Sequence, residues 1–287
     1  MAIQQPVTAF FLVCVLTLGA CDNPSSSNNP ESASGPDPCR AMAVPDTVRL
    51  SEQPAWAESE GLPRHCRVRG TIQSYVQFEM RLPEEWNGRF MMAGCGGFCG
   101  KLLPDKPGHS NTINSALKRG YAAIAHDGGH QAENWETHWS TDPMALELWA
   151  HRVLPVVSEV GIQLATALYG EPPRYRYFSG CSNGGRLGLM AAQRYPDLFD
   201  GIAAGASVFD LSGTAGLWGN WLIRHLPPGQ EPGFPRSKLP MLAAQVMERC
   251  DASDGQRDGL IADPRRCDMK FADLVCADGA DRTDSCL

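Results

Sequence analysis

Short apolar runs alternate with amphipathic segments through most of residues 68–206. Runs of apolar residues between turn residues predict strands, and apolar residues spaced three or four apart predict helices. Strands are predicted at 68–82 (as one strand or two), 89–93, 121–125, 175–181 and 201–206. Helices are predicted at 111–119, 155–169, 184–194 and 238–249, the second with Pro155 in its first turn and Gly170 as its C-cap. Since strands alternate with helices, we expect an α/β fold whose parallel sheet is flanked by helices.

The pattern changes after residue 207. Residues 208–287 are rich in loops, contain one clear helix at 238–249 and carry four cysteines. We therefore expect residues 39–207 to form the N-terminal part of the α/β core and residues 208–287 to begin an inserted domain.

The N-terminus has the pattern of a targeting segment. Residues 9–20 are apolar but too few to span a bilayer stably. They end in Leu18-Gly19-Ala20-Cys21, which resembles a bacterial lipobox and predicts a lipidated Cys21 after removal of residues 1–20, although residues 1–8 contain no Lys or Arg. The alternative is an ordinary signal peptide cleaved near Ala20. Either way we expect an exported protein, a periplasmic or cell-surface lipoprotein or else a secreted one, with residues 21–38 as a flexible tether.

Composition narrows the partners. The 287 residues are 43% hydrophobic and 20% charged, as in an ordinary globular protein, with a net charge of −7 and no basic block. Nucleic acid is therefore excluded as a partner, and a membrane is expected to be met only through the lipid anchor.

Eleven cysteines in an exported chain predict disulfides. Cys14 lies in the apolar targeting segment and Cys21 is the predicted lipid site. Connectivity does not follow from sequence, but proximity suggests the pairs Cys39–Cys66, Cys95–Cys99, Cys250–Cys267 and Cys276–Cys286. Cys181 is then left unpaired. A zinc site is disfavoured because no C-x-x-C pair has a matching second pair.

The residue beside this cysteine carries the strongest chemical signal. Gly180-Cys181-Ser182-Asn183-Gly184 is a G-x-S-x-G motif between a predicted strand and a predicted helix. A serine on such a sharp turn needs neighbours without Cβ atoms, and the following helix points its free N–H groups at the reaction centre. The motif predicts Ser182 as the nucleophile of an acyl transfer.

A glycine-rich turn at 94–100 is the candidate for the oxyanion hole. We expect one donor from Gly96 or Gly97 and the other from the Asn183 N–H. For either glycine alone, a turn needed only for packing is about as good an explanation. A nucleotide-binding function is disfavoured because the turn lacks both G-x-G-x-x-G and a P-loop lysine.

Three polar residues follow the strand at 121–125: His126, Asp127 and His130. They could complete a catalytic triad locally. Hydrolases of this fold, however, have the chain order Ser, acid, His, and the only histidine after Ser182 is His225. We therefore interpret His126 and His130 as structural or close to the substrate.

An acidic loop lies between Cys250 and Cys267. Asp251, Asp254, Asp258 and Asp263 could bind Ca²⁺, or they could stand in a solvated Asp-Gly turn. The residues alone do not favour one of these over the other.

Taken together, these segments resemble the tannase and feruloyl esterase family of α/β-hydrolases. The resemblance rests on residues 83–90, 94–100, 120–130, 174–206 and 250–267. It implies a lid domain, Ser182 as nucleophile and the Asn183 N–H in the oxyanion hole. It also implies structural Ca²⁺ and no organic cofactor, with side-chain ligands from Asp251, Asp254 and Asp258 and carbonyl ligands from Gln256 and Leu260. Similar enzymes cleave esters of hydroxycinnamic or gallic acid, so a small aromatic ester is the expected substrate.

The resemblance also implies what lies outside residues 1–287. The catalytic Asp, the catalytic His and a cysteine that pairs with Cys181 would all follow the lid. We therefore expect a serine carboxylesterase represented by an incomplete chain of low activity. The alternative is an inactive exported lipoprotein with a binding role or none.

Overall fold

A computed structural model describes residues 35–105, 112–133, 135–225, 236–280, 282 and 285–287. The predicted targeting segment 1–20, the lipidation at Cys21 and most of the tether lie outside these residues. The strands are β1 (Val48–Leu50), β2 (Ala55–Ser59), β3 (Leu62–Ile72), β4 (Val76–Pro83), β5 (Arg89–Ala93), β6 (Ala122–His126), β7 (Tyr175–Cys181) and β8 (Gly201–Gly205). The α-helices are α1 (Pro38–Ala41), α2 (Asn114–Leu117), α3 (Pro143–Glu147), α4 (Val153–Tyr169), α5 (Asn183–Arg194), α6 (Leu211–His225) and α7 (Leu239–Cys250).

The eight strands form one sheet in the order β1-β3-β4-β6-β5-β7-β8, with β2 paired to β3. The strands β6, β5, β7 and β8 are parallel, whereas every pairing among β1, β2, β3, β4 and β6 is antiparallel. The sheet is thus mixed, and its parallel part with flanking helices confirms the predicted α/β fold. Its parallel part is the part that carries Ser182.

A tight hairpin explains the antiparallel part. The predicted segment 68–82 is two strands, and Gln73 and Ser74 connect them with φ of 50° and 64°. The Tyr75 amide donates to the Ile72 carbonyl at 3.0 Å, which closes the turn. Two consecutive residues with positive φ are typical of a type I′ hairpin, and they force the next strand to run backwards.

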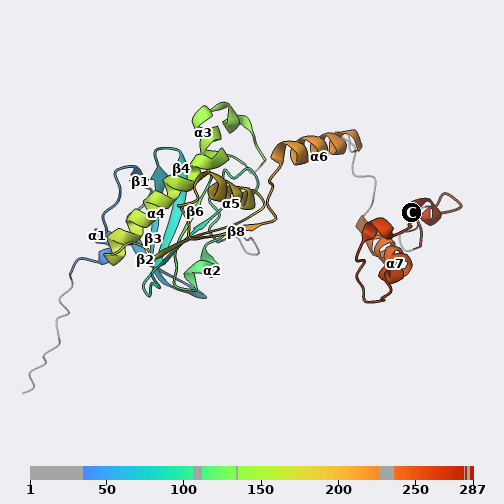
Figure 1. The fold of residues 1–287 in the computed structure, drawn as a ribbon, viewed down its shortest axis with the longest axis horizontal. Coiled ribbons are helices and arrows are strands. Elements are labelled where there is room, and N and C mark those ends of the chain that lie inside the picture. The colour runs from blue at the N-terminus through green and yellow to red at the C-terminus, as the bar shows by residue number, and fades with distance from the viewer. Residues whose placement is uncertain (1–34, 106–111, 134, 226–235, 281, 283–284) are drawn as a thin grey trace, which may run out of the picture.

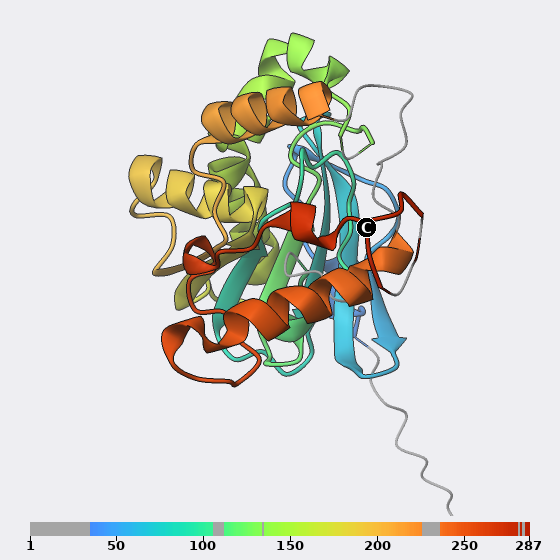
Figure 2. The ribbon, with the colours of Figure 1, turned by 90° about the vertical axis from the view of Figure 1, so that its right-hand side faces the viewer.

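The two faces of the sheet are covered unequally. Phe90, Met92 and Phe178 point to the face covered by α4 and α5 and join the large core there. Met91 and Ala93 point the other way, to a smaller core at α2. Figures 1 and 2 show α4 and α5 against the sheet. The strand period of two, with neighbours on opposite faces, therefore yields two cores of different size.

The helix that covers β4, β5 and β6 begins earlier than predicted. A helical stretch runs from α3 through a wide π turn (Leu148–Arg152) into α4, whose C-cap is Gly170 at φ 79°. Pro155 therefore lies inside a helical stretch and not at its start. The Pro155 ring would clash with the carbonyl four residues before it in a regular helix, and the wider turn just ahead of α4 is where such a residue is tolerated.

The segment after β8 also differs from the prediction. Residues 211–225, predicted as loop, form α6. Gly213, Gly216 and Gly219 lower the helix propensity of this stretch and hid the helical pattern. In Figure 1 α6 leads away from the sheet, and α7 with the turns up to residue 287 lies beyond it; Figure 2 views the molecule from that side. None of the described helices is both long enough and apolar enough to cross a membrane.

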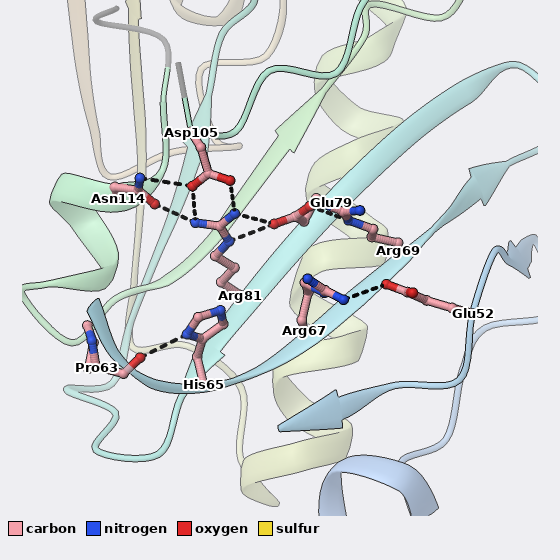
Figure 3. A network of polar contacts seen from close by, with 9 residues as sticks. All are labelled: Glu52, Pro63, His65, Arg67, Arg69, Glu79, Arg81, Asp105 and Asn114. Atoms are coloured by element: carbon pink, nitrogen blue, oxygen red, sulfur yellow. Dashed lines mark hydrogen bonds and ion pairs between the residues drawn. The ribbon is translucent and has the colours of Figure 1, made fainter. Parts of the chain in front are cut away.

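A buried ionic network lies on β3 and β4 (Figure 3). Glu79, fully buried, pairs with Arg69 and receives a hydrogen bond from Arg81 Nε at 2.6 Å. The two Arg81 Nη atoms bind both carboxylate oxygens of Asp105 at 2.6 Å, and Asn114 Nδ2 donates to Asp105 at 3.0 Å. The hydrogen bonds from Arg81 hold the pKa of Asp105 below its usual range. The network joins the sheet to the chain on both sides of residues 106–111.

Four disulfides connect the pairs that proximity suggests, Cys39–Cys66, Cys95–Cys99, Cys250–Cys267 and Cys276–Cys286. Cys181 takes part in none of them. Such a set of disulfides is typical of proteins outside the reducing cytosol.

Candidate active site

Ser182 lies where β7 ends and α5 begins. Its φ is 61° and its ψ is −119°, a backbone that few residues other than glycine adopt. Its amide donates to the Gly205 carbonyl of β8 at 3.0 Å, and its carbonyl accepts the Arg186 amide of α5 at 3.0 Å. The first amides of α5 have no acceptor within the helix, so they and the positive end of the helix dipole lie beside the serine.

Glycines make this turn possible. A Cβ on Gly180 would stand 2.5 Å from the backbone of Gly184, and a Cβ on Gly185 would stand 2.3 Å from the Gly205 carbonyl oxygen. A Cβ on Gly94 would stand 2.7 Å from Gly184 Cα. The strand, the helix and the glycine-rich turn thus approach one another closely enough to exclude side chains.

The glycine-rich turn, residues 94–100, is held at both ends. The Gly94 amide donates to Ser179 of β7 at 2.9 Å, and the Gly100 amide donates to the Asp127 carbonyl at 2.7 Å. Within the turn the Cys95–Cys99 disulfide and a 2.9 Å hydrogen bond from the Cys99 amide to the Gly96 carbonyl form a small ring. Gly96 and Gly97, the predicted oxyanion donors, lie in this ring.

Asn183, the first residue of α5, connects the helix to that turn. Its side-chain Nδ2 donates to the Cys95 carbonyl at 3.1 Å and to Cys99 Sγ at 3.2 Å. The structure thus brings together the segments that carry Ser182, Asn183, Gly96 and Gly97.

The histidines near this site are buried and neutral. The Gly128 amide donates to His126 Nδ1 at 3.1 Å, which places the ring proton on Nε2. Burial lowers the pKa of His126 to about 4 and that of His130 to about 4. The Phe98 backbone raises the pKa of His130 in part, although neither ring nitrogen of His130 has a hydrogen-bond partner within the described ranges. Among the described residues, no hydrogen bond joins a histidine ring to the Ser182 hydroxyl.

Asp127 also has a structural setting. Its carboxylate accepts hydrogen bonds from the Gln77 amide at 3.1 Å, the Gly129 amide at 3.0 Å and Gln131 Nε2 at 2.6 Å. Burial raises the pKa of Asp127 to about 6, against the effect of these hydrogen bonds. The carboxylate therefore ties β6 and the following loop to β4.

Aromatic rings gather beside the glycine-rich turn. Phe98 meets Trp135 and Trp149 edge-on, with ring centroids 5.5 Å and 6.1 Å away. His130 stacks on Trp139 at 3.8 Å. Trp135 is 72% exposed, so the cluster reaches from the interior to the surface.

The predicted calcium loop lies in the C-terminal segment and not beside Ser182 (Figure 1). Asp251, Asp254 and Asp258 each accept a backbone amide of their own loop, from Gly259, Gln256 and Leu260 at 2.9–3.0 Å. Within the described part of the chain, no three His, Cys, Asp or Glu side chains lie close enough together to hold a metal ion. The donor set therefore does not fit a metal in this arrangement, and calcium binding stays a prediction.

Sequence reasoning missed Arg186, which reaches Asn183 from the second turn of α5. Its Nε donates to Asn183 Oδ1 at 2.7 Å. One signal could have found it: Arg186 is the only charged residue among ten consecutive residues from Phe178 to Leu187. A lone charge in an apolar, glycine-rich segment is typically there for a specific contact.

A family model described as "Tannase and feruloyl esterase" matches residues 62–287. The chain is 34% identical over 274 residues to the mono(2-hydroxyethyl) terephthalate hydrolase of Piscinibacter sakaiensis, covering 83% of this chain and 45% of the relative. It is 31% identical over 227 residues to feruloyl esterase B of Aspergillus niger, covering 77% and 42%. The chain thus spans less than half the length of these two relatives.

Solved structures show the same fold. The crystal structure of feruloyl esterase B from Aspergillus oryzae matches with a TM-score of 0.69 and 25% identity, over 87% of this chain and 53% of that one. The chain therefore has an α/β-hydrolase-like fold, with a mixed sheet whose parallel part is flanked by helices.

Proposed function

The chain belongs to the tannase and feruloyl esterase family, and on that premise we propose that Ser182 is the nucleophile of a serine carboxylesterase acting on aromatic esters. The observation that carries the proposal is the Ser182 backbone at φ 61°, on a strand-to-helix turn lined by glycines. Such a turn presents Oγ at the end of the sheet, next to the free amides of a helix.

The proposed reaction begins with attack of Ser182 Oγ on the ester carbonyl. The carbonyl oxygen becomes an oxyanion, which would receive hydrogen bonds from the Asn183 N–H and from Gly96 or Gly97. Collapse of this intermediate expels the alcohol and leaves an acyl group on Ser182, and water then releases the acid.

We propose that the base that takes the Ser182 proton is not His126 or His130. Both rings are buried, the pKa of each is about 4, and neither is hydrogen-bonded to the Ser182 hydroxyl. The resemblance instead implies an Asp and a His outside residues 1–287. Without its base a serine triad loses on the order of 10⁶-fold in kcat, although the oxyanion hole alone retains part of the rate.

The substrate class is proposed from two sources. The named relatives act on feruloyl or terephthalate esters, as their names state. Phe98 places an aromatic ring in the turn that carries the oxyanion donors, and the exposed Trp135 meets this ring edge-on and extends the surface. Aromatic acyl groups stack favourably on such rings.

Acylation by an activated ester tests the proposal without a full triad. We expect p-nitrophenyl ferulate to transfer one feruloyl group to Ser182 of this chain, because nitrophenolate leaves without a general acid. Intact-mass and peptide mass spectrometry should find the acyl group on wild type and not on Ser182→Ala.

Turnover of methyl ferulate separates the alternatives. We expect the 287-residue chain to hydrolyse it barely above background. Serine-dependent turnover that His126→Ala or His130→Ala abolishes would overturn the proposal on the base. Absence of acylation on Ser182 would favour the non-enzymatic alternative, an exported lipoprotein with a binding role.

Export is proposed from the four disulfides, which form in oxidising compartments. Lipidation of Cys21 rests on the sequence pattern alone. Metabolic labelling with a radioactive fatty acid tests it, with Cys21→Ser as the control.

Calcium binding by residues 251–260 is a separate proposal, and it requires the acidic side chains to come closer together than they lie in the described arrangement. Each of Asp251, Asp254 and Asp258 uses one carboxylate oxygen in a backbone hydrogen bond and keeps a second. If the loop binds Ca²⁺, isothermal titration should give one site per chain that Asp254→Asn weakens. Equal heats for calcium injected into the protein and into buffer alone would contradict the proposal.

A further inference from the structure

Arg186 is a buried charge that makes no ion pair with any described carboxylate. The residue is 8% exposed, and burial lowers the pKa of its guanidinium to about 10. Burying a charge without a partner of opposite sign is costly, so an arginine at this position needs a specific set of contacts.

Those contacts use all three nitrogens of the guanidinium. Nη1 donates to the Ala150 carbonyl at 2.7 Å, and Nη2 donates to the Trp149 carbonyl at 2.8 Å. The guanidinium also lies over the Trp149 ring, 4.1 Å from its centroid. Nε is left for Asn183 Oδ1, at 2.7 Å. Carbonyls of the π turn therefore fix the guanidinium in place, and it faces Asn183 in one orientation.

The contact with Asn183 decides which way that amide points. Because Arg186 can only donate, the amide oxygen must face Arg186, and Nδ2 must face the Cys95 carbonyl and Cys99 Sγ. Without Arg186 the Asn183 amide keeps only its two hydrogen bonds to the turn, and its oxygen loses the donor that fixes its orientation.

The turn that receives Nδ2 is rigid in itself. The Cys95–Cys99 disulfide encloses Gly96, Gly97 and Phe98 in a ring. Such a ring moves as a unit, so what has to be set is its place relative to α5. The two hydrogen bonds from the Asn183 side chain join the turn to the helix whose first amide is the Asn183 N–H.

We propose that Arg186 is a positioning residue for the oxyanion hole: through the Asn183 side chain it sets the Gly96–Gly97 amides against the Asn183 amide. This inference rests on the proposed function, because an oxyanion hole serves only a reaction at Ser182. Oxyanion donors act at about 2.7–3.1 Å from the developing charge. A displacement of about 1 Å can cost on the order of 100-fold in rate.

Lysine cannot replace this arginine. Its ammonium is a point charge without the planar fork that meets two carbonyls and an amide at once. Arg186→Lys should therefore behave much like Arg186→Gln. A mere requirement for positive charge would leave Arg186→Lys like wild type.

Two measurements on this chain test the proposal, with Arg194→Gln as the matched control, an exposed arginine at the end of the same helix. The first is hydrogen–deuterium exchange of peptides covering residues 94–100. We expect exchange there to rise at least tenfold in Arg186→Gln and Arg186→Lys, with β3 and β4 unchanged. The second is binding of phenylboronic acid, whose tetrahedral adduct with Ser182 resembles the intermediate and is seen by ¹¹B NMR.

We expect Arg186→Gln to weaken phenylboronic acid at least tenfold and to leave benzoate, which forms no adduct, unchanged. A purely structural role would weaken both ligands or neither. Exchange at 94–100 and boronate affinity within twofold of wild type would overturn the proposal. If Arg186→Gln does not fold, Asn183→Ala cuts the same connection at its other end while keeping the Asn183 N–H, and the same outcomes apply.

Ser182→Ala distinguishes a failure of the proposed function. If this variant binds phenylboronic acid as wild type does, Ser182 is not the nucleophile, and the proposed function fails. The exchange data on Arg186→Gln then still decide whether Arg186 holds the turn.

Discussion

Ser182 has the most demanding backbone of the site. A residue other than glycine at φ 61° and ψ −119° carries on the order of 1–3 kcal/mol of strain. Strain of this kind persists only where surrounding contacts impose it, as the bonds from Ser182 to Gly205 and Arg186 do here. The backbone conformation that the chemistry requires at Ser182 therefore lowers the stability of the fold.

The strain can be measured by comparing two substitutions. Ser182→Gly removes the Cβ that makes this backbone unfavourable, whereas Ser182→Ala keeps it. We expect the Gly variant to unfold with a free energy about 1 kcal/mol higher than the Ala variant, by urea denaturation. Both remove Oγ, so the difference reports only the backbone. Equal stabilities would show that the turn is not strained.

Burial of His126 predicts a pH-dependent stability. The pKa of this histidine falls from 6.5 to about 4 in the folded chain, so between those pH values the unfolded chain binds more protons than the folded one. Stability should therefore decrease as pH falls through this window, by about 2 kcal/mol at pH 5 for this residue. Asp127, whose pKa rises to about 6, acts in the opposite direction between pH 6 and 4.

Urea unfolding of wild type and His126→Gln at pH 7.5 and pH 5.0 isolates the contribution of His126 to the pH dependence of stability. Wild type and His126→Gln share Asp127, so its effect cancels in the comparison. We expect acidification to destabilise wild type more than His126→Gln. The same loss in both proteins would mean that His126 is not buried in its neutral form.

At the scale of elements, the glycine-rich turn and the ends of β6, β7 and β8 meet at one end of the sheet. The strands β3 and β4 carry the buried ionic network. Glu79 is fully buried between Arg69 and Arg81, and Arg81 continues to Asp105 (Figure 3). A network of this kind holds strand register, because each charge has its partners in only one arrangement.

Removal of the Glu79 carboxylate should strongly destabilise the fold. Glu79→Gln leaves Arg69 and the buried Arg81 without their shared partner, and we expect a loss of at least 3 kcal/mol in unfolding free energy. Arg67→Gln on the neighbouring strand β3 is the control, since the pair of Arg67 with Glu52 at 3.2 Å is half exposed. That change should cost less than about 1 kcal/mol. Similar losses of unfolding free energy in the two variants would show that the buried network does not stabilise the fold.

The sequence predicts some elements better than others for physical reasons. β5 and β7 begin and end where predicted, because their apolar runs are bounded by polar and glycine residues. β1 and β2 are short and half-exposed, so no apolar run marks them. The order of strands and the contacts of Arg186 depend on tertiary packing, which local patterns do not contain. The position of Ser182 on a strand-to-helix turn was predictable because its motif reflects local backbone geometry.

At the scale of the whole molecule, apolar surface gathers beyond β8. None of the α6 residues is buried, and Leu217, Trp218 and Trp221 are 77%, 62% and 53% exposed. Among the described strands β8 pairs with β7 alone, so its other edge has no partner strand. Exposed apolar helices and unpaired strand edges both favour association.

We expect this 287-residue chain to self-associate as its concentration rises. The double substitution Trp218→Ser and Trp221→Ser should reduce both the association seen by analytical ultracentrifugation and the fluorescence of a bound apolar dye. Trp135→Ser is the matched control, because Trp135 is 72% exposed and does not belong to α6. A monomer at all concentrations would contradict the expectation.

The four disulfides also bear on how the chain acquires its fold. Each joins cysteines only 27, 4, 17 or 10 residues apart, and no pair encloses or crosses another. A chain that emerges from a translocon N-terminus first can therefore close each bridge before the cysteines of the next one appear. Correct pairing then requires a thiol oxidase that forms each disulfide quickly, and it requires little disulfide isomerisation.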